Sequence, residues 1–118
     1  MKGRSLGERG EQLAVDFLGE RGYKIVARNQ RSVWGEIDVI ARHGADLVFV
    51  EVKTRRAGAS VGPEEAMTPL KLHRVEQLAM AYLDEHDLHT TSWRVEVVSI
   101  ETDADGYPVR LDLHQDLS

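Results

Sequence analysis

The spacing of apolar residues in the first part of the chain predicts a helix over residues 6–21. Four apolar side chains recur there at intervals of three and four residues, which places them on one helix face suited to packing on a sheet. These residues are Leu13, Ala14, Phe17 and Leu18. Gly10 lies in the same stripe, where the missing side chain permits close approach to a neighbouring element. Gly22 follows as a typical helix stop.

Runs of β-branched and alternating apolar residues then predict strands over residues 23–27, 34–41 and 46–54. His43-Gly44-Ala45 is a turn sequence between the last two strands, so they are expected to form a hairpin.

Further along, Thr68 has the character of a helix N-cap and Pro69 that of a first helical residue. A helical apolar stripe follows, and strands are expected over residues 93–100 and 109–113. The stripe consists of Leu72, Val75, Leu78, Ala79, Tyr82 and Leu83. The order α-β-β-β-α-β-β predicts an α/β sandwich in which two helices flank a mixed central sheet.

The 118 residues are expected to form one domain, 1–118, with an acidic C-terminal segment at about 101–118. The chain has no cysteine, which excludes disulfides and thiolate metal sites. The start of the chain is charged and no apolar run is long enough to span a bilayer, so a cytoplasmic protein without membrane contact is expected.

Charge is distributed unevenly within the net value of −5. Residues 1–74 carry +3 and residues 75–118 carry −8. The first part is therefore compatible with a basic surface for nucleic acid, and ordinary solvated charge explains the distribution equally well.

Candidate chemistry lies on the second and third predicted strands. Alternation places Glu51 and Lys53 on the face shared with Leu47 and Phe49. The same rule groups Glu36 and Asp38 with Ile40, and groups Ile37 with Val39 and Ala41. Folding the hairpin then brings Asp38 directly or diagonally across from Glu51.

Two carboxylates at the edge of an apolar core raise each other's pKa and lose hydration, and a divalent cation removes that cost. Oxygen ligands suit Mg²⁺ or Mn²⁺, with Asp38 and Glu51 as ligands. Lys53 then lies where an ammonium orients a nucleophilic water or stabilises charge on a phosphodiester. The alternative is a structural ion network at a strand end.

Glu11 is the helix acid best placed to complete this site. On a helical wheel it flanks the apolar stripe, whereas Asp16 points to the opposite side. The carboxylates of Glu11, Asp38 and Glu51 are therefore expected to lie close enough to share one cation.

Several basic residues and one aromatic residue are candidates for contact with nucleic acid. Arg55, next to Lys53 in the strand, is the strongest candidate for contact with phosphate, although solvated charge is the common alternative for any one such residue. The other candidates are Arg28, Arg31, Arg56, Lys71 and Arg74. Trp34 either stacks on a splayed base or packs as a core or rim aromatic, the more common role.

The segments Gly35-Glu36-Ile37-Asp38 and Phe49-Val50-Glu51-Val52-Lys53-Thr54-Arg55 together resemble the signature of the YraN-like bacterial proteins. That family is similar to archaeal Holliday junction resolvases and to the wider PD-(D/E)XK nucleases. The resemblance implies a restriction-endonuclease-like fold, metal ligation by Asp38 and Glu51, and a catalytic role for Lys53. It equates Glu11 with the helix acid of the resolvases and gives Glu36 a secondary place in the motif.

One departure from the family pattern is visible in the fourth strand, where Arg94-Val95-Glu96-Val97-Val98 replaces Arg-Phe-Asp-Val-Val. The core motif is intact. The expected function is thus a Mg²⁺-dependent (or Mn²⁺-dependent) DNA endonuclease acting on branched DNA, in the form of a homodimer. The alternative is a module on a nuclease fold that binds nucleic acid or protein without cutting.

Overall fold

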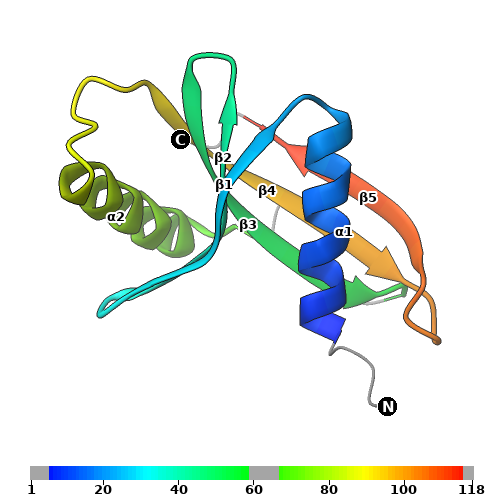
Figure 1. The fold of residues 1–118 in the computed structure, drawn as a ribbon. Helices are drawn as coiled ribbons and strands as arrows, with labels where there is room; N and C mark the ends of the chain where they lie inside the picture. Colours follow the sequence, from blue (N-terminus) through cyan, green and yellow to red (C-terminus); the bar gives the residue numbers. More distant parts are fainter. Residues whose placement is uncertain (1–5, 59–66, 116–118) are drawn as a thin grey trace, which may run out of the picture.

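The computed structural model describes residues 6–58 and 67–115 and confirms the expected order of elements (Figure 1). The helices are α1 (Leu6–Glu20) and α2 (Pro69–Glu85). The strands are β1 (Lys24–Ser32), β2 (Gly35–His43), β3 (Asp46–Arg56), β4 (Trp93–Thr102) and β5 (Pro108–His114).

The five strands form one mixed sheet in the order β1-β2-β3-β4-β5. The pairing of β3 with β4 is parallel and the other three pairings are antiparallel. Helix α2 lies in the crossover between β3 and β4, because parallel neighbours need a long connection.

Alternation along β3 divides the core between the two faces of the sheet. Val48 and Val50 belong to the apolar cluster that contains Ala14 and Leu18 of α1. Leu47 and Phe49 belong to a second cluster, which contains Val75, Leu78 and Ala79 of α2. Each helix therefore covers its own face of the sheet, as Figure 1 shows.

The predicted helix ends are confirmed in detail. Gly22 follows α1 with φ +88°, the left-handed conformation that glycine adopts without strain. The Thr68 hydroxyl accepts a hydrogen bond from the Lys71 N–H at 3.2 Å, so Thr68 is the N-cap of α2. Gly10 also has its expected role, since a Cβ there would lie 1.9 Å from the Thr54 hydroxyl oxygen on β3.

The β1–β2 hairpin is longer than predicted and its outer half separates from the sheet. β1 and β2 stay paired out to Ser32 and Gly35, whereas the pairing of β2 with β3 ends at Val39 and Val50. Beyond that point the hairpin is a two-stranded ribbon, which twists strongly. Ile37 consequently packs in the α2 cluster with Ile40, so its predicted grouping with Val39 and Ala41 is wrong.

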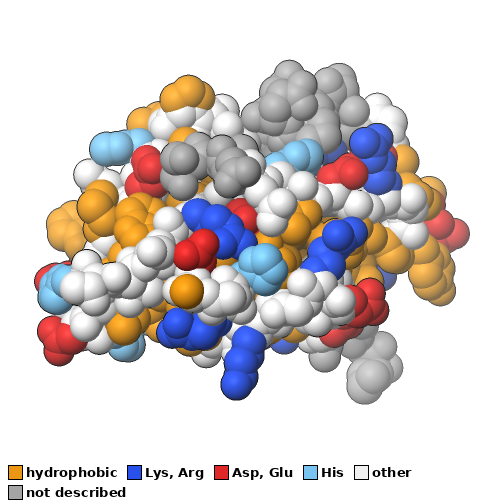
Figure 2. Space-filling model, turned by 90° about the horizontal axis from the view of Figure 1, so that it is seen from above, with side chains coloured by type: hydrophobic (Ala, Val, Ile, Leu, Met, Phe, Trp, Pro, Cys, Tyr) orange, Lys and Arg blue, Asp and Glu red, His pale blue; other side chains and the backbone are white. Residues whose placement is uncertain are grey.

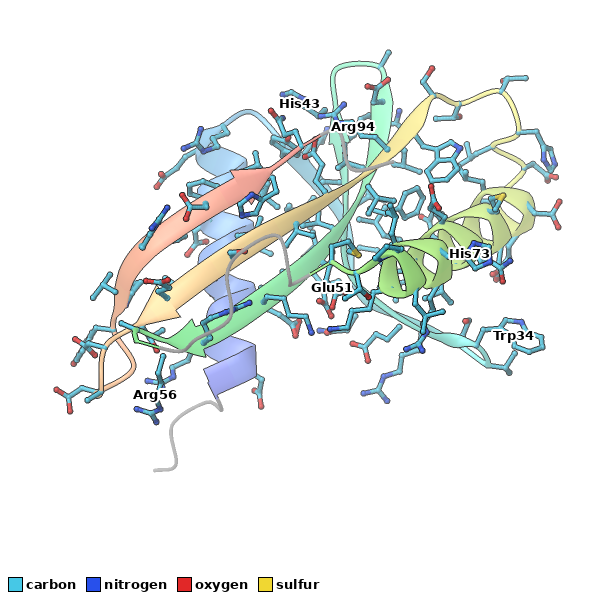
Figure 3. All side chains as sticks on the ribbon, turned by 180° about the vertical axis from the view of Figure 1, so that it is seen from behind. Trp34, His43, Glu51, Arg56, His73 and Arg94 are labelled. Atoms are coloured by element: carbon cyan, nitrogen blue, oxygen red, sulfur yellow. The ribbon has the colours of Figure 1, made fainter. Side chains whose placement is uncertain are left out.

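A buried charge network lies at the other end of β3, around Arg94 of β4. Its guanidinium donates to Glu96 and to Asp46, both at 2.6 Å, and to the His43 Nδ1 at 2.8 Å. The Tyr23 hydroxyl donates to the second oxygen of Glu96, also at 2.6 Å. Figure 3 shows Arg94 and His43 together, at the opposite end of the sheet from Arg56.

Glu96 is fully buried, so these bonds satisfy a carboxylate that water does not reach. The acid at which the fourth strand departs from the family pattern therefore has a structural partner. In the part of the chain that the structure describes, no helix is both long and apolar enough to cross a membrane.

Candidate active site

Asp38 lies where β2 and β3 stop pairing. Its Oδ2 accepts a hydrogen bond from the Val52 N–H at 2.8 Å. The ladder ends one step earlier, at Val39 and Val50, so the carboxylate takes the place of a strand partner for this N–H. The ladder stops before Asp38 and Glu51 are reached, and Asp38 is close enough to Glu51 for its charge to raise the pKa of that carboxyl.

Glu51 and Lys53 extend from β3 on the face that α2 covers. The Lys53 Nζ lies 3.6 Å from the Glu51 Oε1, and both side chains are partly exposed. They line a pocket of about 220 Å³ with Val75 and Leu78 of α2. In Figure 3, Glu51 lies on β3 beside α2.

The pKa values of the two strand carboxyls are raised. Burial is the main cause for Glu51, the charge of Asp38 adds to it, and Lys53 opposes both. For Asp38, burial again raises the pKa, the hydrogen bond from Val52 lowers it and the charge of Glu36 raises it. Both acids are thus held in a setting that resists their ionisation unless a cation is near.

Glu11 approaches Asp38 from α1. Burial raises the pKa of Glu11, and the negative charge of Asp38 raises it further. A hydrogen bond with the Asn29 side chain lowers the pKa of Glu11. The backbone of Asn29 is in the left-handed conformation, with φ 50°. Asn29 was not predicted as a site residue, although an Asn in a polar stretch after an apolar strand is a signal for such a conformation.

Asp38 therefore lies between two acids that come from different layers, Glu11 of α1 and Glu51 on the α2 side. Among residues 6–58 and 67–115, no three acidic or imidazole side chains form a group ready to hold a metal ion. The expectation that Glu11, Asp38 and Glu51 already lie close enough to share one cation is thus wrong for this arrangement.

The donor set nevertheless fits Mg²⁺ or Mn²⁺ in its chemistry. Mg²⁺ commonly uses one or two protein carboxylates and completes its shell with water and substrate phosphate. Asp38 and Glu51 supply two such carboxylates on neighbouring strands, with Glu11 as a third acid within electrostatic reach of Asp38.

Several predicted phosphate contacts gather around this pocket. Lys71 and Arg74 of α2 line it together with Glu51 and Lys53. Glu36 lines it as well and forms a 3.6 Å ion pair with Arg31. The pocket thus combines Glu36, Glu51 and Lys53 from the sheet with two cations from α2.

The remaining basic residues do not line this pocket. Arg28 lies beside Glu11 and donates to the Gln12 side chain at 2.9 Å. Arg55 follows Lys53 by two residues, so strand alternation directs it to the same face. Arg56 instead donates to the Ala104 carbonyl at 2.7 Å and fixes the β4–β5 turn. Figure 2 shows one face on which charges of both signs are interspersed, without a uniform basic patch.

Trp34 is a rim residue and not a core residue. Its side chain is at the tip of the β1–β2 hairpin, as Figure 3 shows, and the residue is 78% exposed. The Ser32 hydroxyl accepts a hydrogen bond from the Trp34 N–H at 3.2 Å, which defines the turn that presents the indole.

Comparison with known proteins gives the family of the chain. The family model described as uncharacterised protein family UPF0102 matches residues 10–100. The chain belongs to UPF0102. This confirms the resemblance to YraN-like bacterial proteins, and the matched region contains Glu11, Asp38, Glu51 and Lys53.

Individual UPF0102 proteins match most of the chain. One from Roseiflexus castenholzii is 49% identical over 96 residues, which cover 80% of this chain and 77% of the relative. One from Symbiobacterium thermophilum is 48% identical over 103 residues, or 87% of each chain. A third, from Pelobacter propionicus, is 42% identical and covers 82% of this chain and 71% of its own.

Proposed function

We propose that this protein is a Mg²⁺-dependent endonuclease that hydrolyses DNA phosphodiester bonds, with branched DNA as its substrate class. One observation carries the proposal. Asp38 occupies the gap where β2 leaves β3, and its charge acts directly on Glu51, which pairs with Lys53. Two neighbouring acids and an ammonium are the groups that metal-assisted phosphodiester hydrolysis requires, and Glu51 and Lys53 line the pocket.

Asp38 and Glu51 would hold the ion, and Glu11 would join them after a shift of its side chain. A bound Mg²⁺ supplies a Lewis acid for the phosphoryl oxygen and lowers the pKa of a water ligand. The raised pKa values of the acids support this assignment, because a cation would remove the repulsion and burial cost that now disfavour their charged forms.

Lys53 is the residue that acts on the substrate directly. Its ammonium, 3.6 Å from Glu51, can donate to a non-bridging phosphate oxygen and stabilise the charge that builds up during attack. Lys71 and Arg74, on the helix side of the same pocket, would bind the flanking phosphates and fix the strand in register.

A branched substrate has implications for assembly and location. A four-way junction presents two equivalent strands for cutting, and residues 6–58 and 67–115 of one copy place Glu51 and Lys53 together in one pocket. We therefore propose that the active form is a homodimer with one site per copy, acting in the cytoplasm.

The test is a cleavage panel. The full chain is incubated with labelled single-stranded, linear duplex, nicked and four-way DNA in Mg²⁺, in Mn²⁺ and in excess EDTA. The proposal expects cut products in the metal-containing reactions, most from the four-way DNA, and none in EDTA. Absence of cutting on every substrate would overturn it.

The second candidate is a module that binds nucleic acid or a protein partner without cutting. The charge of −8 on residues 75–118 favours it, since like charges repel a long nucleic acid from that half of the chain. The same panel separates the two candidates when each substrate is also tested for binding. Metal-independent binding without any product would support the module.

A further inference from the structure

The outer face of α2 and the tip of the β1–β2 hairpin enclose a second, larger pocket. Its volume is about 460 Å³. Its lining is apolar apart from one guanidinium and one amide, and consists of Trp34, Arg74, Gln77, Leu78, Met80 and Ala81.

This pocket is continuous with the candidate active site. Trp34, Arg74 and Leu78 line both pockets, and the smaller one also contains Glu51 and Lys53. Arg74 thus lies at the boundary between an apolar hollow and a site built for phosphate.

The backbone that carries the indole is fixed by contacts on both sides of Trp34. The Ser32 hydroxyl accepts from the Trp34 N–H and donates to the Gly35 carbonyl, which closes the turn. Gly35 rests on α2, because a Cβ there would lie 3.4 Å from Leu78 Cδ1. The backbone of Trp34 is therefore fixed, while the residue is 78% exposed.

We propose that Trp34 and the 460 Å³ pocket form a subsite for one unpaired nucleobase of a DNA strand whose neighbouring phosphate lies at Glu51 and Lys53. An exposed indole offers a stacking surface that any base can use, and Gln77 adds a donor and an acceptor for a base edge. This subsite rests on the proposed nuclease function and narrows its substrates to DNA in which a base beside the cut can leave the stack, as at a branch point or in a single strand.

Charge favours a nucleotide over a second copy of the chain as the occupant. Among the described residues, Arg74 has no carboxylate partner. Lys71 and Lys53 line the active-site pocket together with Arg74. An apolar surface that leads to Arg74 and Lys71 matches a base joined to its phosphates, since the two acids of the active-site pocket, Glu36 and Glu51, already have cationic partners. The core of a protein interface is instead depleted of such charges.

The experiment measures binding of a fluorescein-labelled single strand by fluorescence anisotropy, with the full chain in excess EDTA so that nothing is cut. A matched strand carries one abasic site. The variants are Trp34→Ala, Trp34→Phe and Val33→Ala. The last is the control, because Val33 is 91% exposed on the same tip and does not line the pocket.

Loss of one stacked base should weaken binding by about tenfold to a hundredfold. We expect that loss for Trp34→Ala, a small change for Trp34→Phe and none for Val33→Ala. The abasic strand should bind wild type as weakly as the intact strand binds Trp34→Ala, and Trp34→Ala should not discriminate between the two strands.

Equal affinity of Trp34→Ala and Val33→Ala would overturn the subsite, as would no measurable binding by wild type. Sedimentation showing a dimer that Trp34→Ala alone dissociates would assign the surface to a second copy instead. Because the assay needs no catalysis, it can succeed in a protein that never cuts. Conversely, if Trp34→Ala cuts DNA as fast as the wild type, the proposed nuclease function stands and the proposed subsite is wrong.

Discussion

The Asp38 carboxylate accepts the Val52 N–H at 2.8 Å, one residue past the point where β2 and β3 stop pairing. One oxygen of the carboxylate is thus bonded to the backbone of β3, and the other is left to bind a ligand. It also orients Asp38 against the strand that carries Glu51 and Lys53. The gap in the sheet therefore creates the site and holds its central acid in place.

Substituting Asp38 separates the two roles of its side chain. Asp38→Asn keeps an acceptor for Val52 and removes a negative charge that burial disfavours, so at neutral pH it should make the metal-free protein more stable than the wild type. Asp38→Ala leaves the N–H without this acceptor and should be about 1–3 kcal/mol less stable than Asp38→Asn. Thermal unfolding in EDTA measures both, and equal stability of the two variants would argue against the hydrogen bond.

Stability should also respond to pH through the same acids. A carboxyl whose pKa is raised on folding holds its proton in the folded state after the unfolded chain has lost it. The proton therefore stabilises the folded state at low pH. This stabilisation is lost as the pH rises from the ordinary pKa, 3.8 for Asp and 4.5 for Glu, through the raised pKa of the folded protein.

The double variant Asp38→Asn with Glu51→Gln should lack this loss. Urea unfolding in EDTA at a series of pH values gives the comparison. The free energy of unfolding of the double variant relative to wild type should increase across that window and then level off. A difference that stays constant with pH would show that the two pKa values are not raised.

Much of this arrangement was predictable because strand parity is a strict local rule. The hairpin turn at Gly44 gave the pairing of β2 with β3, and alternation along β3 placed Glu51 and Lys53 together on the face that α2 covers. Parity failed at Ile37, since no local pattern reveals where a hairpin leaves its sheet and twists. The partners of Glu96 were likewise hidden, because Tyr23 lies 73 residues away in the sequence.

The Arg94 network should be worth far more to stability than a surface ion pair. Burial lowers the pKa of Arg94, but the hydrogen bonds to Glu96 and Tyr23 raise it and prevail. Arg94→Met leaves Glu96 buried without its cation and should cost about 3–5 kcal/mol in urea unfolding.

Arg110→Met is the matched control for that variant. Arg110 pairs with Asp112 at 2.6 Å, yet its side chain is 61% exposed, so the loss should stay below about 1 kcal/mol. Similar losses in the two variants would contradict the role assigned to burial.

Glu11 should contribute to metal affinity, whereas its neighbour on the other side of α1 should not. Calorimetric titration with Mn²⁺ should show affinity falling about tenfold or more in Glu11→Gln, because one negative charge near Asp38 is lost. Asp16→Asn is the control, since Asp16 is exposed and bonds Gln12 of the same helix. Unchanged affinity in Glu11→Gln would remove Glu11 from the site.

Cleavage of a labelled four-way DNA by single-residue variants tests the central claim most directly. In Mg²⁺, Lys53→Met and Glu51→Gln should each slow single-turnover cutting by at least about a hundredfold. Lys24→Met, at the exposed start of β1, should cut at the wild-type rate. Cutting by Lys53→Met or Glu51→Gln at the wild-type rate, or by the wild type in EDTA, would contradict a metal-dependent site built on Asp38, Glu51 and Lys53.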